Sequence, residues 1–68
     1  MALGNRVKEL RARHQITQGD LADKVDVTRQ TIVALEKGSY VPSLLLAMKI
    51  SKIFSVPIEE IFYMEDDD

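Results

Sequence analysis

Two short helical patterns separated by only two residues constrain the fold of this 68-residue chain more than any other feature. Apolar residues recur at helical spacing from Gln18 to Val25 and again from Thr28 to Lys37. Only Asp26 and Val27 lie between the two patterns, which makes the turn very short. Helices joined in this way cross closely, and Ala22 supplies the small side chain that such a crossing requires.

Hydroxyl residues mark where both helices begin, and a glycine marks where the second one ends. Thr17 precedes the first pattern as an N-cap, with Asp20 in its first turn, and Thr28 caps the second pattern. Gly38 follows the last helical residue, where a left-handed conformation commonly ends a helix. Four apolar side chains are expected to hold the pair in place: Leu21, Val25, Ile32 and Leu35.

The rest of the chain is also predicted to be helical, because no segment alternates with a period of two for long enough to form a buried strand. A first helix is expected from Asn5 to Arg13, a fourth from Leu44 to Phe54, and a short fifth from Pro57 to about Tyr63. The acidic residues 65–68 are expected to fray. The prediction is a single all-α domain of five helices that fills residues 1–68.

Composition excludes several classes of protein. The chain has no cysteine, which excludes disulfides and thiolate metal sites, and its one histidine, His14, belongs to no cluster of potential ligands. No metal and no cofactor are therefore expected. The longest apolar run, residues 44–48, is too short to cross a membrane, and no signal peptide is evident. These features predict a soluble, cytoplasmic protein without a membrane partner.

The formal net charge of −2 is unevenly distributed along the chain. Residues 1–40 carry seven basic and five acidic side chains, whereas residues 41–68 carry two basic and six acidic ones. Binding to phosphates depends on local positive charge rather than on the sum. The net acidity is therefore no bar to nucleic-acid binding by the N-terminal half.

The segment TQGDLADKVDVTRQTIVALEKGSYVPSL resembles the helix-turn-helix of the Cro/cI-type (Xre) family of bacterial, archaeal and phage regulators. The following AMKISKIFSVPIEEIF resembles the last two helices of that family, so the similarity covers about residues 5–62. The resemblance implies a compact, lambda-repressor-like domain with its helix-turn-helix at about residues 17–37. It also implies that the second of these helices enters the major groove of double-stranded DNA.

The residues expected to contact bases lie on that exposed helix. Arg29 can pair with O6 and N7 of guanine, and Gln30 with N6 and N7 of adenine. Val33 would meet a thymine methyl group, and the small Ala34 would permit close approach. A solvated helix start is the competing interpretation of Arg29 and Gln30, and a scattered apolar surface residue is that of Val33.

The resemblance also implies contacts to the DNA backbone. In the family, the glutamine at the position of Gln18 binds a phosphate and braces the start of the recognition helix, so it is expected to brace Arg29 here. A neutral helix-start residue is the alternative interpretation of Gln18, and helix capping is that of Ser43. The expected backbone-contacting residues are Gln18, Thr28, Lys37, Ser39, Tyr40 and Ser43.

Two further expectations concern the scaffold. In relatives, the positions of Arg11 and Glu36 form an ion pair between the first and third helices, and a partly buried structural pair is expected here. Asp26 occupies the turn position where the family usually has glycine, often because the chain there needs a positive φ. Aspartate tolerates that region better than most residues, and its carboxylate would place negative charge near the DNA.

The fourth helix is too apolar for a single buried stripe, and Leu45 stands where the family more often has a polar residue. The excess of apolar residues on this helix predicts a homodimer. The alternative is a monomer whose core simply uses leucine freely. Small relatives sometimes add strands from the chain ends to such an interface, and residues 1–3 and 62–64 are the candidates here. The expected interface residues are Leu45, Ile53, Phe62, Tyr63 and Met64.

The expected function is sequence-specific binding of double-stranded DNA by a transcriptional regulator, a homodimeric repressor on a palindromic operator. The alternative is a protein-interaction module, such as an antitoxin that binds a partner protein through its apolar C-terminal surface. An enzyme is not expected, because nothing in the sequence pairs a nucleophile with a base. No small-molecule ligand is indicated either.

Overall fold

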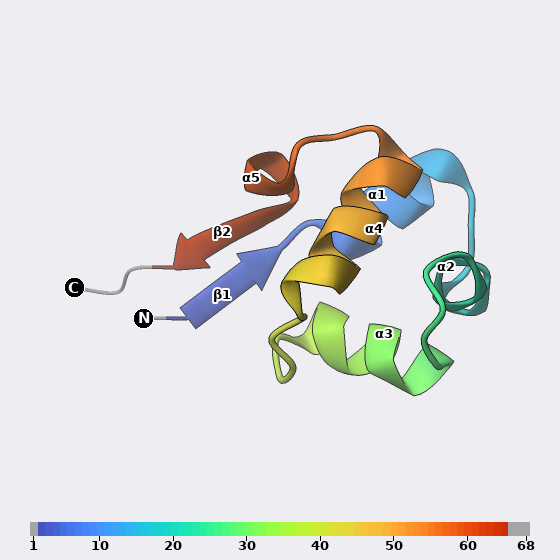
Figure 1. Cartoon of the computed structure of the whole chain (residues 1–68), viewed down its shortest axis with the longest axis horizontal. Helices are drawn as coiled ribbons and strands as arrows, with labels where there is room; N and C mark the ends of the chain where they lie inside the picture. Colours follow the sequence, from blue (N-terminus) through green and yellow to red (C-terminus); the bar gives the residue numbers. More distant parts are fainter. Residues whose placement is uncertain (1, 66–68) are drawn as a thin grey trace.

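The computed structural model describes residues 2–65, in which helices pack around one core and the two ends of the chain pair beside them (Figure 1). The helices are α1 (Val7–His14), α2 (Gln18–Lys24), α3 (Arg29–Lys37), α4 (Leu44–Phe54) and α5 (Ile58–Ile61). The strands are β1 (Ala2–Asn5) and β2 (Phe62–Glu65). The expected class of a five-helix domain is confirmed, with a two-stranded sheet added.

Helix α2 begins with a capping box, in which two residues satisfy each other's backbone. The Asp20 backbone N–H donates to Thr17 Oγ1 at 3.0 Å, and the Thr17 backbone N–H donates to the Asp20 carboxylate at 3.1 Å. The hydrogen bond from the Thr17 backbone lowers the pKa of the Asp20 carboxyl below its ordinary value. Because that pKa is lowered by folding, the box stabilises the fold above about pH 4 and weakens as the carboxyl protonates.

The turn between α2 and α3 has the strained geometry expected of it. Asp26 lies at φ 63°, in the left-handed region that favours glycine. The Val27 N–H donates to the carbonyl oxygen of Ala22 at 3.0 Å, which ties the turn back to α2. Thr28 then caps α3 by accepting from the Thr31 N–H, and Gly38 ends that helix at φ 82°.

One cluster of buried apolar side chains fills the space between the helices. All five helices and β2 contribute to it: Val7, Leu10, Leu21, Ala22, Val25, Ile32, Leu35, Leu46, Ala47, Ile50, Phe54, Ile61 and Phe62. The four side chains expected to hold α2 and α3 together are all within it and at most 1% exposed. Their burial fixes α3 against the body of the domain.

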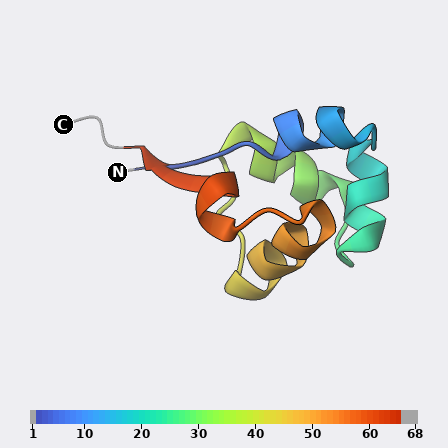
Figure 2. The ribbon, with the colours of Figure 1, turned by 90° about the horizontal axis from the view of Figure 1, so that it is seen from above.

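The chain ends differ from the sequence-based expectation. Asn5 ends strand β1 rather than opening α1, and Phe62 and Tyr63 belong to β2 rather than to α5. The strands run antiparallel, with Asn5 opposite Phe62 and Ala2 opposite Glu65. The ribbon they form extends to one side of the helices (Figure 2). It pairs the two ends of one chain, whereas the sequence suggested strands at an interface between two copies.

The physical reason for this difference is the length of the strands. Four residues are too few for an alternating pattern to stand out from the neighbouring helices. Glu65, expected to fray with the acidic end, is part of β2, and the expectation for residues 66–68 lies outside the described residues. Within residues 2–65, no helix is long and apolar enough to span a membrane.

Replacing Asp26 with glycine is expected to raise the free energy of unfolding by about 0.5–1 kcal/mol, since glycine adopts the left-handed conformation without a Cβ clash. Asp23→Gly is the matched control, because it removes the same charge from within α2 and should lower the free energy of unfolding by roughly 0.5–1 kcal/mol. Urea unfolding of the three proteins measures the difference. A loss of stability in both variants would contradict the assignment of strain to Asp26.

Candidate nucleic-acid interface

Helix α3 lies along the lower edge of the molecule in Figure 1, with one side in the core and the other in solvent. Ile32 and Leu35 are buried, while Arg29, Gln30 and Lys37 are exposed. Neither Arg29 nor Lys37 forms an ion pair within residues 2–65. The first turn of α3 thus presents one guanidinium and one carboxamide to solvent, with a lysine at the other end of the helix.

The other two residues expected to contact bases are less accessible. Val33 and Ala34 are both half-buried, so each offers only part of its side chain to a partner. The Ala34 carbonyl oxygen accepts from the Ser39 backbone N–H at 3.1 Å and from Ser39 Oγ at 3.2 Å. Ser39 therefore caps the C-terminal end of α3, and its side chain is also exposed to solvent.

Three more residues of the expected backbone-contacting set lie at helix starts or in the loop after α3. Thr28 and Ser43 are the exposed N-caps of α3 and α4, so the capping interpretation of Ser43 is confirmed. Tyr40 is 39% exposed. The starts of both helices carry backbone N–H groups that can donate hydrogen bonds to an anion.

Gln18 occupies a different place from the one expected of it. Its Nε2 donates to Glu36 Oε1 at 3.1 Å, and no hydrogen bond to Arg29 is present within residues 2–65. This hydrogen bond joins the first turn of α2 to the last turn of α3. Gln18 therefore braces the C-terminal end of the helix rather than its start.

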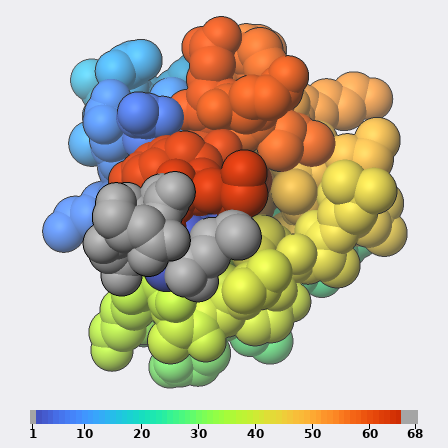
Figure 3. All heavy atoms as spheres, turned by 90° about the vertical axis from the view of Figure 1, so that its left-hand side faces the viewer, coloured from blue at the N-terminus to red at the C-terminus, as the bar shows by residue number. Residues whose placement is uncertain are grey.

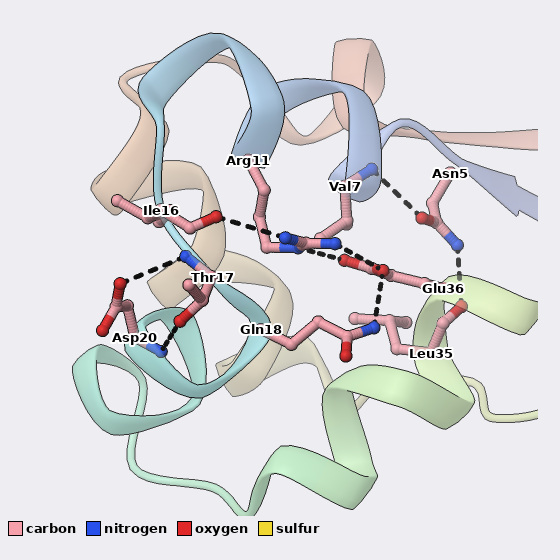
Figure 4. A network of polar contacts seen from close by, with 9 residues as sticks. All are labelled: Asn5, Val7, Arg11, Ile16, Thr17, Gln18, Asp20, Leu35 and Glu36. Atoms are coloured by element: carbon pink, nitrogen blue, oxygen red, sulfur yellow. Dashed lines mark hydrogen bonds and ion pairs between the residues drawn. The ribbon is translucent and has the colours of Figure 1, made fainter.

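The ion pair expected between Arg11 and Glu36 is present and forms the centre of a polar network (Figure 4). Arg11 Nε donates to Glu36 Oε2 at 2.6 Å and Nη2 donates to Oε1 at 3.0 Å, which is a two-pronged contact. Arg11 Nη1 also donates to the Ile16 carbonyl oxygen at 3.1 Å. The side chains are only 14% and 7% exposed, and the hydrogen bonds to Glu36 raise the pKa of Arg11 above its ordinary value.

Asn5 is a contact that the sequence did not predict. Its Nδ2 donates to the Leu35 carbonyl oxygen at 2.9 Å, and its Oδ1 accepts from the Val7 N–H at 3.1 Å (Figure 4). An asparagine that accepts from the backbone N–H two residues later forms an Asx turn, which is a local contact. The bond to Leu35 spans thirty residues of sequence and has no local signal.

The residues expected at a dimer interface fall into two groups. Leu45, Ile53, Tyr63 and Met64 are exposed, at 63%, 36%, 37% and 71%. Phe62 is only 8% exposed and belongs to the core, so its assignment to an interface is wrong: its place in β2 turns the ring inward.

The set of exposed large apolar residues is larger than expected. We call it the α4–β2 surface, and it consists of Val41, Leu44, Leu45, Met48, Ile53, Tyr63 and Met64. Figure 3 shows the start of α4 and the end of β2 on the same face.

Comparison with known proteins places this arrangement in a family. A family model described as helix-turn-helix matches residues 7–61. The chain belongs to this helix-turn-helix family. An uncharacterized HTH-type transcriptional regulator from Methanocaldococcus jannaschii is 59% identical over 64 residues, which is 94% of this chain and 97% of that protein. YgzD from Bacillus subtilis, described in the same words, is 57% identical over 63 residues, 93% of this chain and 96% of YgzD.

More distant similarities agree with this assignment. The cryptic phage CTXphi transcriptional repressor RstR from Vibrio cholerae is 32% identical over 57 residues, 84% of this chain and 51% of the repressor. The crystal structure of a Bacteroides fragilis protein matches with a TM-score of 0.80 and 24% identity, over 90% of this chain and 98% of that protein. The structural match bears on the fold alone. Together with the family model, these relatives confirm the resemblance to Cro/cI-type regulators.

Breaking the Arg11–Glu36 pair is expected to destabilise the domain strongly. Glu36→Ala should lower the free energy of unfolding by about 3 kcal/mol, because it leaves a nearly buried guanidinium without its partner. The exposed pair between Glu9 and Arg13 supplies the control, and Glu9→Ala should cost no more than about 0.5 kcal/mol. Equal and small effects of the two substitutions in urea unfolding would show that the pair does not hold the scaffold together.

Proposed function

We propose that this protein binds double-stranded DNA in a sequence-specific manner and regulates transcription, with α3 as its recognition helix. The observation that carries the proposal is the exposed first turn of α3, bearing Arg29 and Gln30, on a helix whose other end is anchored to α1 and α2. A helix presented in this way fits a major groove about 12 Å wide. Membership of the helix-turn-helix family supports the same function.

The exposed polar residues of α3 divide by the contacts they would make. Arg29 would pair with guanine and Gln30 with adenine, whereas Val33 and Ala34, being half-buried, would contribute close apolar contact. Lys37 would neutralise a phosphate. The other phosphate contacts would come from Gln18, Thr28, Ser39, Tyr40 and Ser43, which position the protein without reading sequence.

The finer proposal is a cytoplasmic repressor that binds a palindromic operator as a homodimer. One domain of this size makes few base contacts, whereas two copies related by a dyad read half-sites about one helical turn apart. The α4–β2 surface would be the interface, because it exposes seven large apolar residues away from the start of α3. The repression itself is proposed by analogy with the phage repressor RstR.

A protein-interaction module, such as an antitoxin, is the second candidate function. The same α4–β2 surface favours it, because an exposed apolar face suits a partner protein as well as a second copy. Selection from a random DNA pool separates the two functions, since only a sequence-specific regulator enriches a common motif.

Substitutions on α3 should divide into two kinds of effect. Arg29→Ala and Gln30→Ala should each weaken binding to the best selected DNA by about 1–3 kcal/mol and relax specificity. Lys37→Ala should weaken binding to all sequences similarly. It should also reduce the slope of log affinity against log salt concentration by about one, because one fewer counterion is released. Fluorescence anisotropy titrations at several salt concentrations measure both effects.

Lys8→Ala is the matched control for Lys37→Ala, because it removes the same charge from an exposed position on α1. It should leave the affinity for selected DNA within about twofold of the wild type. The recognition-helix proposal fails if Arg29 and Gln30 can both be replaced without effect on the best selected site.

Leu45→Glu should raise the dissociation constant of the homodimer at least about tenfold, because it places a charge in a desolvated interface. The domain should remain folded, since Leu45 is 63% exposed. Ala12→Glu adds the same charge at an exposed position of α1 and should leave dimerisation unchanged. Sedimentation velocity over a range of concentrations measures the equilibrium. A wild type that stays monomeric at high micromolar concentration would refute the dimer.

A further inference from the structure

The C-terminal end of α3 is tied to the start of α1 by a single carboxamide (Figure 4). Asn5 donates through Nδ2 to the Leu35 carbonyl oxygen and accepts through Oδ1 from the Val7 N–H. The contact needs a donor toward α3 and an acceptor toward α1 on one short side chain. Asparagine provides both groups, whereas an ionised aspartate of the same length has no donor and serine is too short to span the two partners.

The paired chain ends hold Asn5 in place. Asn5 lies opposite Phe62, whose ring is in the core. The next backbone N–H, that of Arg6, donates to the Ile61 carbonyl oxygen at 2.9 Å. The backbone on both sides of Asn5 is therefore attached to the C-terminal part of the chain.

A second set of contacts closes the ribbon around Tyr63. Tyr63 pairs with Gly4, and a Cβ at position 4 would overlap the tyrosine ring, so a larger residue there would displace the ring from this position. The Arg6 guanidinium carbon lies 4.7 Å from the centre of that ring, within cation–π distance. Arg6 Nη1 also donates to the Glu60 carbonyl oxygen at 3.0 Å. These contacts hold the two-stranded ribbon in place, and the ribbon in turn fixes the backbone at Asn5.

We propose that Asn5 is a positioning residue for DNA recognition, which acts by fixing the C-terminal end of α3 against the paired chain ends. The proposal rests on the proposed function. Helix α3 has nine residues and is about 13 Å long, so a small rotation at Leu35 displaces Arg29 and Gln30 at the far end. Hydrogen bonds to base edges weaken steeply with distance and angle, whereas charge attraction to phosphates does not. Loss of the Asn5 contact should therefore affect cognate DNA more than other DNA.

The test compares Asn5→Ala with Asn5→Ser in binding to the best selected site and to a scrambled duplex. Serine keeps an acceptor for the Val7 N–H but is too short to reach the Leu35 carbonyl oxygen. At a temperature where all proteins are folded, both variants should bind the selected site about tenfold more weakly. Binding to the scrambled duplex should change less than about twofold.

Ser51→Ala is the matched control. It removes a side-chain hydrogen bond of the same kind, from Ser51 Oγ to the Val56 carbonyl oxygen, at the far end of α4. Ser51→Ala should lower the melting temperature about as much as the Asn5 variants do. It should leave the ratio of the affinity for the selected site to the affinity for the scrambled duplex unchanged. A merely structural role for Asn5 predicts the same unchanged ratio for the Asn5 variants, and that result would overturn the proposal.

Hydrogen exchange separates failure of this proposal from failure of the proposed function. If the wild type prefers no DNA sequence, the proposed function has failed, but the amides of Gly38 and Ser39 that close α3 still report on its end. Faster exchange of these amides in Asn5→Ser than in Ser51→Ala would support the positioning role. Equal exchange in the two variants would refute it.

Discussion

The carboxylate of Glu36 is the point on which the arrangement of this domain depends. Arg11 donates to it twice and Gln18 once, so side chains from α1 and α2 converge on the last turn of α3. A helix that must expose its first turn can be held only by its inner face and its other end. Apolar packing of Ile32 and Leu35 holds the inner face of α3, and the hydrogen bonds to Glu36 hold its C-terminal end.

This division explains how so small a chain can hold α3 in place while leaving its first turn in solvent. Within residues 2–65, every buried side-chain polar atom has a hydrogen-bond partner. The polar network around Glu36 therefore carries no cost from an unpaired buried group. The α4–β2 surface lies on a separate part of the chain from the first turn of α3. The proposed base contacts and the proposed protein interface would therefore use different residues.

Local chemistry explains why much of the fold was predictable. Thr17, Thr28 and Ser43 cap the helices that follow them, and Asp26 has the positive φ expected of a position where glycine is usual. The pair between Arg11 and Glu36 was implied by family resemblance rather than by spacing. The placement of Arg29, Gln30 and Lys37 in solvent also follows from helical periodicity, because the opposite side of α3 is apolar.

The sequence by itself determined the helices, their caps, the tight turn and the apolar face of each helix, since these depend on neighbouring residues. Only the tertiary structure decided that the chain ends pair as strands, that Phe62 is buried, that Gln18 meets Glu36 and that Asn5 reaches Leu35. Each of these contacts joins residues distant in sequence. Their partners are chosen by how the helices pack, so no local pattern encodes them.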